Sequence, residues 1–319
     1  MKRTPLPVYT HSACLGHDPG PGHPERPERL GAVVQALGDG LGDDLDWREA
    51  PRATRGQLLR VHAPRLLEAV LAPVEGHAML DPDTVVSPGS AEAALRAAGA
   101  AVAAVDCVLL GEAPAAFCAV RPPGHHATAS EAMGFCLFNN VAVAAAQALE
   151  RHGLARVSIV DFDVHHGNGT QAIFEADARV QYLSSHQVPL FPDSGSGRER
   201  GVGNIFNAGL APGSAGDAFR ALWQDRLLPA IDAFAPNLLL VSAGFDGHAR
   251  DPLADLRLQA GDYAWLTAQL RVLAARHCRD RMVSMLEGGY DLEALAACSL
   301  AHVEALLAPD EAGAGPHAR

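Results

Sequence analysis

Histidines, carboxylates and one tyrosine gather in four short segments, and each segment directly follows an apolar run. The four segments are Arg121-Pro-Pro-Gly-His125-His126, Asp161-Phe-Asp163-Val-His165-His166-Gly-Asn168, Ala243-Gly-Phe-Asp246 and Glu287-Gly-Gly-Tyr290. Imidazoles and carboxylates bind divalent cations and transfer protons, and a phenol can donate a hydrogen bond to a developing oxyanion. These residue types predict metal-assisted acid–base chemistry if the fold brings the segments together.

Asp163 and His165 are candidate metal ligands, because residues two apart in an extended segment point to the same side. Asp246, at another strand end, would complete an Asp-His-Asp set and leave an open position for water and substrate, as catalytic zinc requires. This oxygen-rich set also suits manganese or iron. The alternative is a loop held by ordinary hydrogen bonds, but so many acids and imidazoles would be costly to bury without a counter-ion.

The adjacent residues His125 and His126 predict a general acid and a general base. Each imidazole needs an orienting partner on its other ring nitrogen, and Asp161 and Asn168 are available for that purpose. Tyr290 follows two glycines, which allow the backbone to turn sharply and the ring to enter a pocket. Taken alone, a histidine pair or a tyrosine at a turn is more often structural, so the functional interpretation depends on the four segments meeting.

Phe135 and Phe191 each lie beside glycine or proline in segments expected to be loops. Two aromatic walls would form a narrow tube for an alkyl chain, whereas the alternative is that each ring packs in the core.

Short apolar runs rich in β-branched residues are typical of strands buried on both faces. We expect such strands at Ala116–Val120, Val157–Val160, Val180–Leu183, Leu238–Val241 and Met282–Leu286. Alanine-rich amphipathic helices are expected between them, at Ser90–Val105, Asn140–His152 and Asp262–His277. This alternation predicts an α/β fold with a mostly parallel sheet. Ligands of such sheets bind outside the carboxyl ends of the strands, where all four polar segments would lie.

No internal repeat or linker divides the chain, so residues 1–319 are predicted to form one domain. Pro19–Pro27 is expected to be a rigid loop because its four prolines block regular hydrogen bonding. Phe191–Gly216, rich in glycine, serine and asparagine, is expected to form long loops, and the tail from Pro309 to Arg319 is expected to be frayed.

Composition excludes several classes of protein. The net charge is −12 and no block of lysine or arginine is present, so a nucleic-acid partner is not expected. No apolar stretch is expected to reach the roughly 18 residues of a membrane span, and no apolar block follows the first residues as in a signal peptide. The six cysteines include no C-x-x-C pair, which predicts reduced thiols in a cytoplasmic protein.

The chain resembles the zinc-dependent histone deacetylase family, including its bacterial lysine deacylases and amidohydrolases, over about Val8 to His302. The resemblance lies in these motifs: Gly16-His17, His23-Pro24-Glu25-Arg26-Pro27-Glu28-Arg29-Leu30, Arg121-Pro122-Pro123-Gly124-His125-His126-Ala127, Gly134-Phe135-Cys136-Leu137-Phe138-Asn139-Asn140, Asp161 to Thr170, Ser242-Ala243-Gly244-Phe245-Asp246 and Leu286-Glu287-Gly288-Gly289-Tyr290. It implies a single-domain arginase–deacetylase α/β fold, with a central, mostly parallel sheet of about eight strands and helices on both faces.

The resemblance also implies a role for each candidate residue. Asp163, His165 and Asp246 would bind zinc. His125 and His126 would flank the metal-bound water, backed by Asp161 and Asn168, and Tyr290 would polarise the substrate carbonyl. Phe135 and Phe191 would be tunnel walls, with Gly134, Leu253 and His23 also at the substrate. A potassium ion is implied beside the zinc, held partly through backbone oxygens by Asp161, Asp163, His165 and Ser184.

Two positions refine the resemblance. Asn168 is an aspartate in the nuclear-type class of the family and an asparagine in the other large class, class II, which this chain therefore resembles. Polyamine-selective relatives carry an acidic residue just after an Asp-Pro pair, whereas here Leu253 follows Asp251-Pro252. We therefore expect acyl-lysine in a protein or peptide as the substrate.

Competing hypotheses remain at this stage. An amidohydrolase acting on acetylated polyamines or other small acylated amines would use the same chemistry. A catalytically inactive binder of acyl-lysine would not need the complete metal set and Tyr290. Arginase-like activity is conceivable for the fold, but the Arg121–His126 and Gly288–Tyr290 segments favour a deacylase. Whether the chain forms a homo-oligomer is left open.

Overall fold

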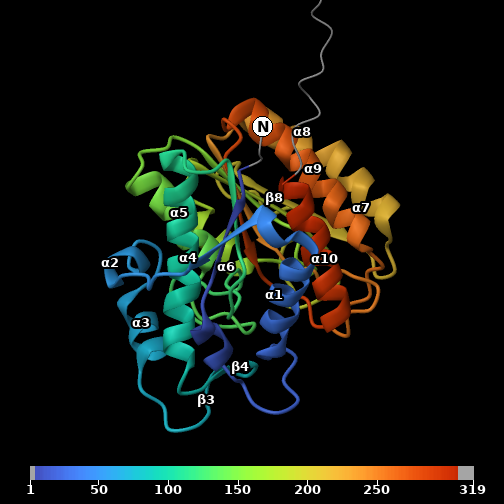
Figure 1. Cartoon of the computed structure of the whole chain (residues 1–319). Helices are drawn as coiled ribbons and strands as arrows, with labels where there is room; N and C mark the ends of the chain where they lie inside the picture. Colours follow the sequence, from blue (N-terminus) through green and yellow to red (C-terminus); the bar gives the residue numbers. More distant parts are fainter. Residues whose placement is uncertain (1–3, 308–319) are drawn as a thin grey trace, which may run out of the picture.

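Eight parallel strands form the centre of the molecule in the computed structural model, which describes residues 4–307 (Figure 1). In spatial order they are β2 (Leu45–Glu49), β1 (Leu6–Thr10), β5 (Ala115–Cys118), β10 (Met282–Leu286), β9 (Leu238–Ala243), β6 (Val157–Asp161), β7 (Val180–Gln187) and β8 (Ile205–Leu210). Every neighbouring pair is parallel. The predicted parallel α/β architecture is confirmed. The four strands that lead into the polar segments are the adjacent central strands β5, β10, β9 and β6.

Helices cover both faces of this sheet, as predicted (Figure 1). One face is covered by α4 (Ser90–Leu110), α5 (Asn140–Glu150) and α6 (Asn168–Phe174). The other face is covered by α1 (Glu28–Leu41), α7 (Gly216–Leu222), α8 (Leu228–Phe234), α9 (Ala260–His277) and α10 (Leu292–Leu307). Two short helices, α2 (Arg55–Leu58) and α3 (Pro64–Leu71), precede a separate antiparallel hairpin of β3 (Ala78–Asp81) and β4 (Thr84–Val86).

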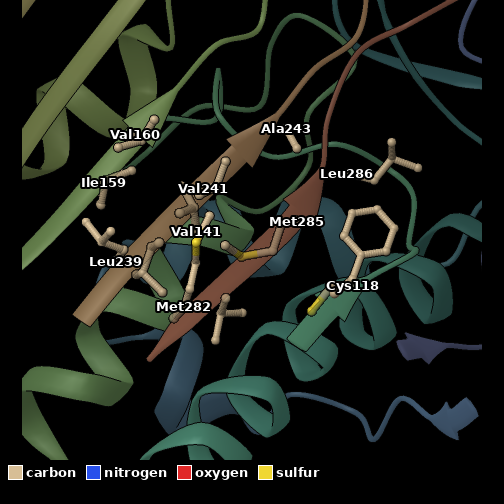
Figure 2. Close-up of a cluster of buried hydrophobic side chains, with 14 of the residues drawn as sticks. Cys118, Val141, Ile159, Val160, Leu239, Val241, Ala243, Met282, Met285 and Leu286 are labelled. Carbon is tan, nitrogen blue, oxygen red and sulfur yellow. The ribbon is translucent and has the colours of Figure 1, made fainter. Parts of the chain in front are cut away.

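The central strands are apolar along their whole length because both of their faces are covered. Figure 2 shows Ile159, Val241 and Met285 on three neighbouring strands, with Val141 reaching them from α5. All four side chains are inaccessible to solvent. This packing anchors the strands, so that the residues just beyond their carboxyl ends start from fixed positions.

Three strands of the central sheet were not predicted, and neither was the separate hairpin of β3 and β4. Strands β1 and β2 lie at one side of the sheet, and β2 is only partly buried. Strand β8 corrects the expectation of loops throughout Phe191–Gly216: its six residues pair with β7 at the opposite edge. The polar Asn207 and the small Gly209 interrupt its apolar pattern, which explains why the sequence did not indicate a strand.

Helix α4 corrects the expectation that no segment is long and apolar enough to cross a membrane. It has 21 residues, and the mean hydropathy of its most apolar 18-residue window is 1.8. Among the described residues it is the one helix that is long and apolar enough to cross a membrane. The protein buries 67% of that window, and α4 packs against α5, β5 and β1. The apolar character of α4 is therefore explained by its place in the core. The expected frayed tail, residues 309–319, lies outside the described residues.

Candidate active site

The three predicted metal ligands lie together beyond the ends of β6 and β9. One ligand atom from each of Asp163, His165 and Asp246 lies within 4.8 Å of the other two, and all three residues are buried. The Nδ1 atom of His165 is 3.1 Å from Asp163 Oδ1 and 3.1 Å from Asp246 Oδ2. The backbone orients the carboxylates, because the N–H of Gly288 donates to Asp163 Oδ2 at 2.9 Å and the N–H of Val164 donates to Asp246 Oδ1 at 2.9 Å.

The electrostatics of this triad indicate a site for a cation. Burial and then the charge of Asp163 raise the pKa of Asp246, because two buried carboxylates repel one another. Burial opposes a charge on His165, yet the hydrogen bonds to Asp163 and Asp246 raise its pKa to about 10. The two carboxylates therefore favour a positive charge beside them. A divalent ion held by one nitrogen and two carboxylates fits the site and leaves a position open for substrate.

Only glycine fits at position 288, because the carboxylates of Asp163 and Asp246 lie directly beside its backbone. A Cβ atom at position 288 would lie 2.0 Å from Asp246 Oδ2 and 2.6 Å from Asp163 Oδ2. Any other residue at Gly288 would therefore displace two of the three candidate ligands.

The histidine pair lies beside the triad, and each imidazole has the orienting partner expected from the sequence. His125 Nδ1 is 3.0 Å from Asp161 Oδ2, and His126 Nδ1 is 2.8 Å from Asn168 Oδ1. Burial opposes charge on His125, but the carboxylates of Asp161 and Asp163 outweigh burial and hold its pKa well above the usual value. Burial and the neighbouring His125 hold the pKa of His126 well below the usual value. The surroundings of the two imidazoles therefore shift their pKa values in opposite directions.

A cavity of about 250 Å³ leads to these residues from the surface. Its walls include His126, His165, Gly134, Phe135, Phe191, Leu253 and Tyr290, together with Asp83 and Leu190. The ring of Phe191 lies edge-on to His126, with centroids 5.1 Å apart, and Phe135 lies edge-on to Tyr290 at 5.8 Å. The predicted aromatic walls are thus on the cavity.

The domain family described as the histone deacetylase domain matches residues 23–306, which include all of these residues. The chain belongs to the histone deacetylase family. Members of the family hydrolyse amides, so the chain is an amide hydrolase of the deacetylase type.

Similar proteins come from several kingdoms. A histone deacetylase-like amidohydrolase of Pseudomonas aeruginosa is 42% identical over 319 residues, covering 92% of this chain and 83% of that protein. The human polyamine deacetylase HDAC10 is 38% identical over 301 residues, covering 89% of this chain and 44% of that protein. The crystal structure of the HDA15 HD domain superposes with a TM-score of 0.91 at 34% identity, covering 95% of this chain and 88% of that one. This match shows the arginase–deacetylase fold implied by the motifs.

The structure also places Ser184 and His23, which the resemblance assigned to potassium and to substrate. Ser184 lies on β7 in register with Asp161 on β6, and both are fully buried, so the elements expected to hold potassium are adjacent. His23, expected at the substrate, does not line the cavity. Its ring lies edge-on to Phe135, with centroids 4.7 Å apart, and its Nε2 is 3.3 Å from the backbone oxygen of Asp83. His23 supports the aromatic wall in this structure and does not face the cavity.

The loop that carries Tyr290 is held by Arg29, which the sequence did not single out as functional. The Arg29 guanidinium donates to the carbonyls of Gly289 at 2.6 Å and Glu287 at 2.5 Å, and it lies 4.8 Å from the centre of the Tyr290 ring. Burial raises the pKa of Tyr290 well above its usual value despite the nearby guanidinium. The phenol therefore keeps its proton and can donate a hydrogen bond to substrate.

Asp83 was also missed by the sequence analysis, although it lines the cavity. It lies at the turn between β3 and β4, and its Oδ1 accepts hydrogen bonds from the N–H of Gly134 at 3.1 Å and the hydroxyl of Thr84 at 2.9 Å. A short hairpin far from the four motifs carries no catalytic signature, so only the folded structure reveals its place at the cavity.

Proposed function

We propose that this chain is a zinc-dependent deacylase that hydrolyses the side-chain amide of N-acyl-lysine in peptides or proteins, releasing lysine and a carboxylate. The observation that carries the proposal is the buried triad of Asp163, His165 and Asp246 beside a cavity that is lined by Phe135, Phe191 and Tyr290. A lysine side chain is long and thin, so its alkyl part matches the cavity while its acyl group reaches the triad.

Zinc would be held by the three triad side chains, and potassium would be held near Asp161 and Ser184, as the family resemblance implies. When bound, zinc supplies a Lewis acid for the acyl carbonyl and lowers the pKa of water. Zinc is preferred over manganese and iron because of the resemblance, since two carboxylates and one imidazole do not by themselves distinguish these metals.

The residues of the chain would divide the remaining work. His126 lines the cavity with its Nδ1 bonded to Asn168, so its Nε2 is free to take a proton from the attacking water. The Tyr290 hydroxyl would donate to the oxyanion as the carbonyl carbon becomes tetrahedral. A protonated histidine of the pair would then give a proton to the leaving amine. Phe135 and Phe191 would exclude water from the alkyl chain.

The choice of acyl-lysine over acetylated polyamines rests on Leu253. This residue lines the cavity as expected, and its apolar side chain cannot pair with a second ammonium group. The alternative is polyamine hydrolysis, which is favoured by the similarity to a protein named polyamine deacetylase and by the net charge of −12. Rates on a panel of acyl-lysine peptides, acetylspermidine and acetylputrescine would decide between these two substrates.

Tyr290→Phe tests the chemistry directly because it removes one hydroxyl. We expect kcat on an acyl-lysine peptide to fall by about 100-fold or more, with little change in the thermal unfolding temperature. Tyr263→Phe is a matched control: Tyr263 is also buried, but its hydroxyl has no hydrogen-bond partner in the described structure and does not line the cavity. A Tyr290→Phe variant within about threefold of wild type, or a control equally impaired, would contradict the proposed function.

A further inference from the structure

One buried carboxylate outside the predicted catalytic set connects the wall of the cavity to the tyrosine loop. Asp251 is only 8% exposed. Its Oδ2 accepts a hydrogen bond from the backbone N–H of Tyr290 at 2.7 Å, and its Oδ1 accepts one from the backbone N–H of Leu253 at 3.0 Å. Tyr290 and Leu253 both line the cavity. A single side chain therefore holds two cavity residues that are far apart in the sequence.

These two hydrogen bonds constrain the backbone more than an ordinary loop contact would. Burial and the charge of Asp246 raise the pKa of Asp251 to about 7, and once this side chain is ionised, each N–H bond to it is about twice as strong as one between neutral groups. The two bonds use different oxygens of the same planar carboxylate, so the backbone at Tyr290 cannot move relative to the backbone at Leu253 without lengthening one of them. The separation of the two cavity residues is thereby restrained.

The other supports of the tyrosine loop act on its earlier residues. Asp163 accepts from the N–H of Gly288, and Arg29 donates to the carbonyl of Gly289. Among the described residues, Asp251 is the one whose side chain accepts a hydrogen bond from the N–H of Tyr290 itself. Removing Asp251 would leave those other supports and the triad in place, while freeing the backbone that directs the phenol.

We propose that Asp251 is a positioning residue that sets the place of the Tyr290 hydroxyl relative to the substrate-facing side chain of Leu253. This inference rests on the proposed function of Tyr290 as the donor to the oxyanion. A substrate that packs against Leu253 is then aligned with the phenol through one carboxylate. Since a misplacement of about 1 Å can reduce a rate by about 100-fold, loss of the carboxylate should impair chemistry more than binding.

A double-mutant cycle in the zinc-loaded full chain tests the inference, using an acyl-lysine peptide as the probe. Asp251→Ala alone should lower kcat by about 10- to 100-fold, with KM changed by less than about threefold. In the Tyr290→Phe background, Asp251→Ala should lower kcat by less than about threefold further, because the group that it positions is already gone. If Asp251→Ala does not fold, Asp251→Asn keeps one acceptor oxygen and enters the same cycle.

Asp262→Ala serves as the control for a merely structural effect. Asp262 is also a buried aspartate with two partners, the N–H of Gln259 and the side chain of Arg220, and it lies off the cavity. We expect it to lower thermal stability with kcat within about twofold of wild type. The proposed role of Asp251 would be overturned, with the proposed function intact, if Asp251→Ala did not lower kcat. It would also be overturned if Asp251→Ala lowered kcat equally in wild type and in the Tyr290→Phe background. A Tyr290→Phe variant as active as wild type would overturn the proposed function as well.

Discussion

Leu253→Glu should shift substrate choice toward acetylated polyamines. The change puts a carboxylate on the wall of the cavity, where wild type has an apolar side chain. The N–H of Leu253 remains bonded to Asp251, so the new side chain should leave the backbone in the same direction as leucine does. Asp83 already contributes one carboxylate to the same cavity, and the expected shift is therefore the effect of one added charge.

The size of the shift follows from the half-buried position of Leu253. An exposed charge pair contributes about 0.2–1 kcal/mol, whereas a hydrogen bond to a charged group contributes about 1.5–3 kcal/mol. A partly screened pair between the new carboxylate and the second ammonium of the substrate should lie between these limits, at about 1–2 kcal/mol. That range corresponds to about a 5- to 30-fold change in the ratio of kcat/KM values.

The assay compares kcat/KM for acetylspermidine with kcat/KM for one acyl-lysine peptide, in wild type and in each variant. Leu253→Gln is the matched control, since glutamine has the size of glutamate without its charge, and it should leave the ratio nearly unchanged. The gain from glutamate should also shrink as salt is added, because screening weakens a partly exposed pair. An unchanged ratio, an equal shift in the glutamine variant, or a wild type that already prefers polyamines would refute the reasoning about this position.

Two further predictions concern the metal and the response to pH. By elemental analysis, wild type should bind about one zinc ion per chain, and Asp246→Ala should bind far less because one of three ligands is lost. Full zinc content and retained activity in Asp246→Ala would exclude this ligand set. Burial lowers the pKa of His62 to about 4. Between pH 6.5 and 4 the unfolded chain therefore binds a proton that the folded chain does not, and stability should fall as the pH falls through this range. His62→Gln can still donate to the carbonyl of Thr128 and accept from the N–H of Asn139. Urea denaturation measures the unfolding free energy of each protein at pH 7 and at pH 4.5. The fall between these two pH values should be about 2–3 kcal/mol smaller in His62→Gln than in wild type, because the variant lacks the titrating imidazole. An equal fall in both proteins would contradict the lowered pKa of His62.

The central strands could be predicted from the sequence because a strand covered on both faces must be apolar throughout. The runs at Ile159 and Val241 satisfy that condition and lie on β6 and β9. The outer strand β2 does not satisfy it: Trp47 and its neighbours are partly exposed, so this strand lacks a continuous apolar run. Prediction therefore failed at the two edge strands, β2 and β8, and it also missed β1, which is buried between β2 and β5.

The candidate site was predictable to the same extent, because its chemistry requires particular residue types. Metal ligands and proton-transfer groups come from a small set of side chains, and the triad and the pair His125 and His126 follow strands that could be recognised. Asp251 acts through backbone N–H groups, which every non-proline residue possesses, so its partners Tyr290 and Leu253 carry no matching signature. Such contacts appear only when the chain is folded.

The proline-rich loop before α1 shows why a motif can be recognised before its physical purpose is known. Its Glu25 is fully buried and bonds to Arg29 at 2.9 Å and to Arg121 at 2.6 Å. Arg29 holds the loop of Tyr290, and Arg121 begins the segment that leads to His126. Two buried guanidinium groups are tolerable only with a carboxylate between them, since removing one partner of a buried pair costs about 3–5 kcal/mol. Glu25 thus joins the supports of the predicted base and the predicted oxyanion donor, and the rigid loop that carries it belongs to the framework of the site without touching the cavity.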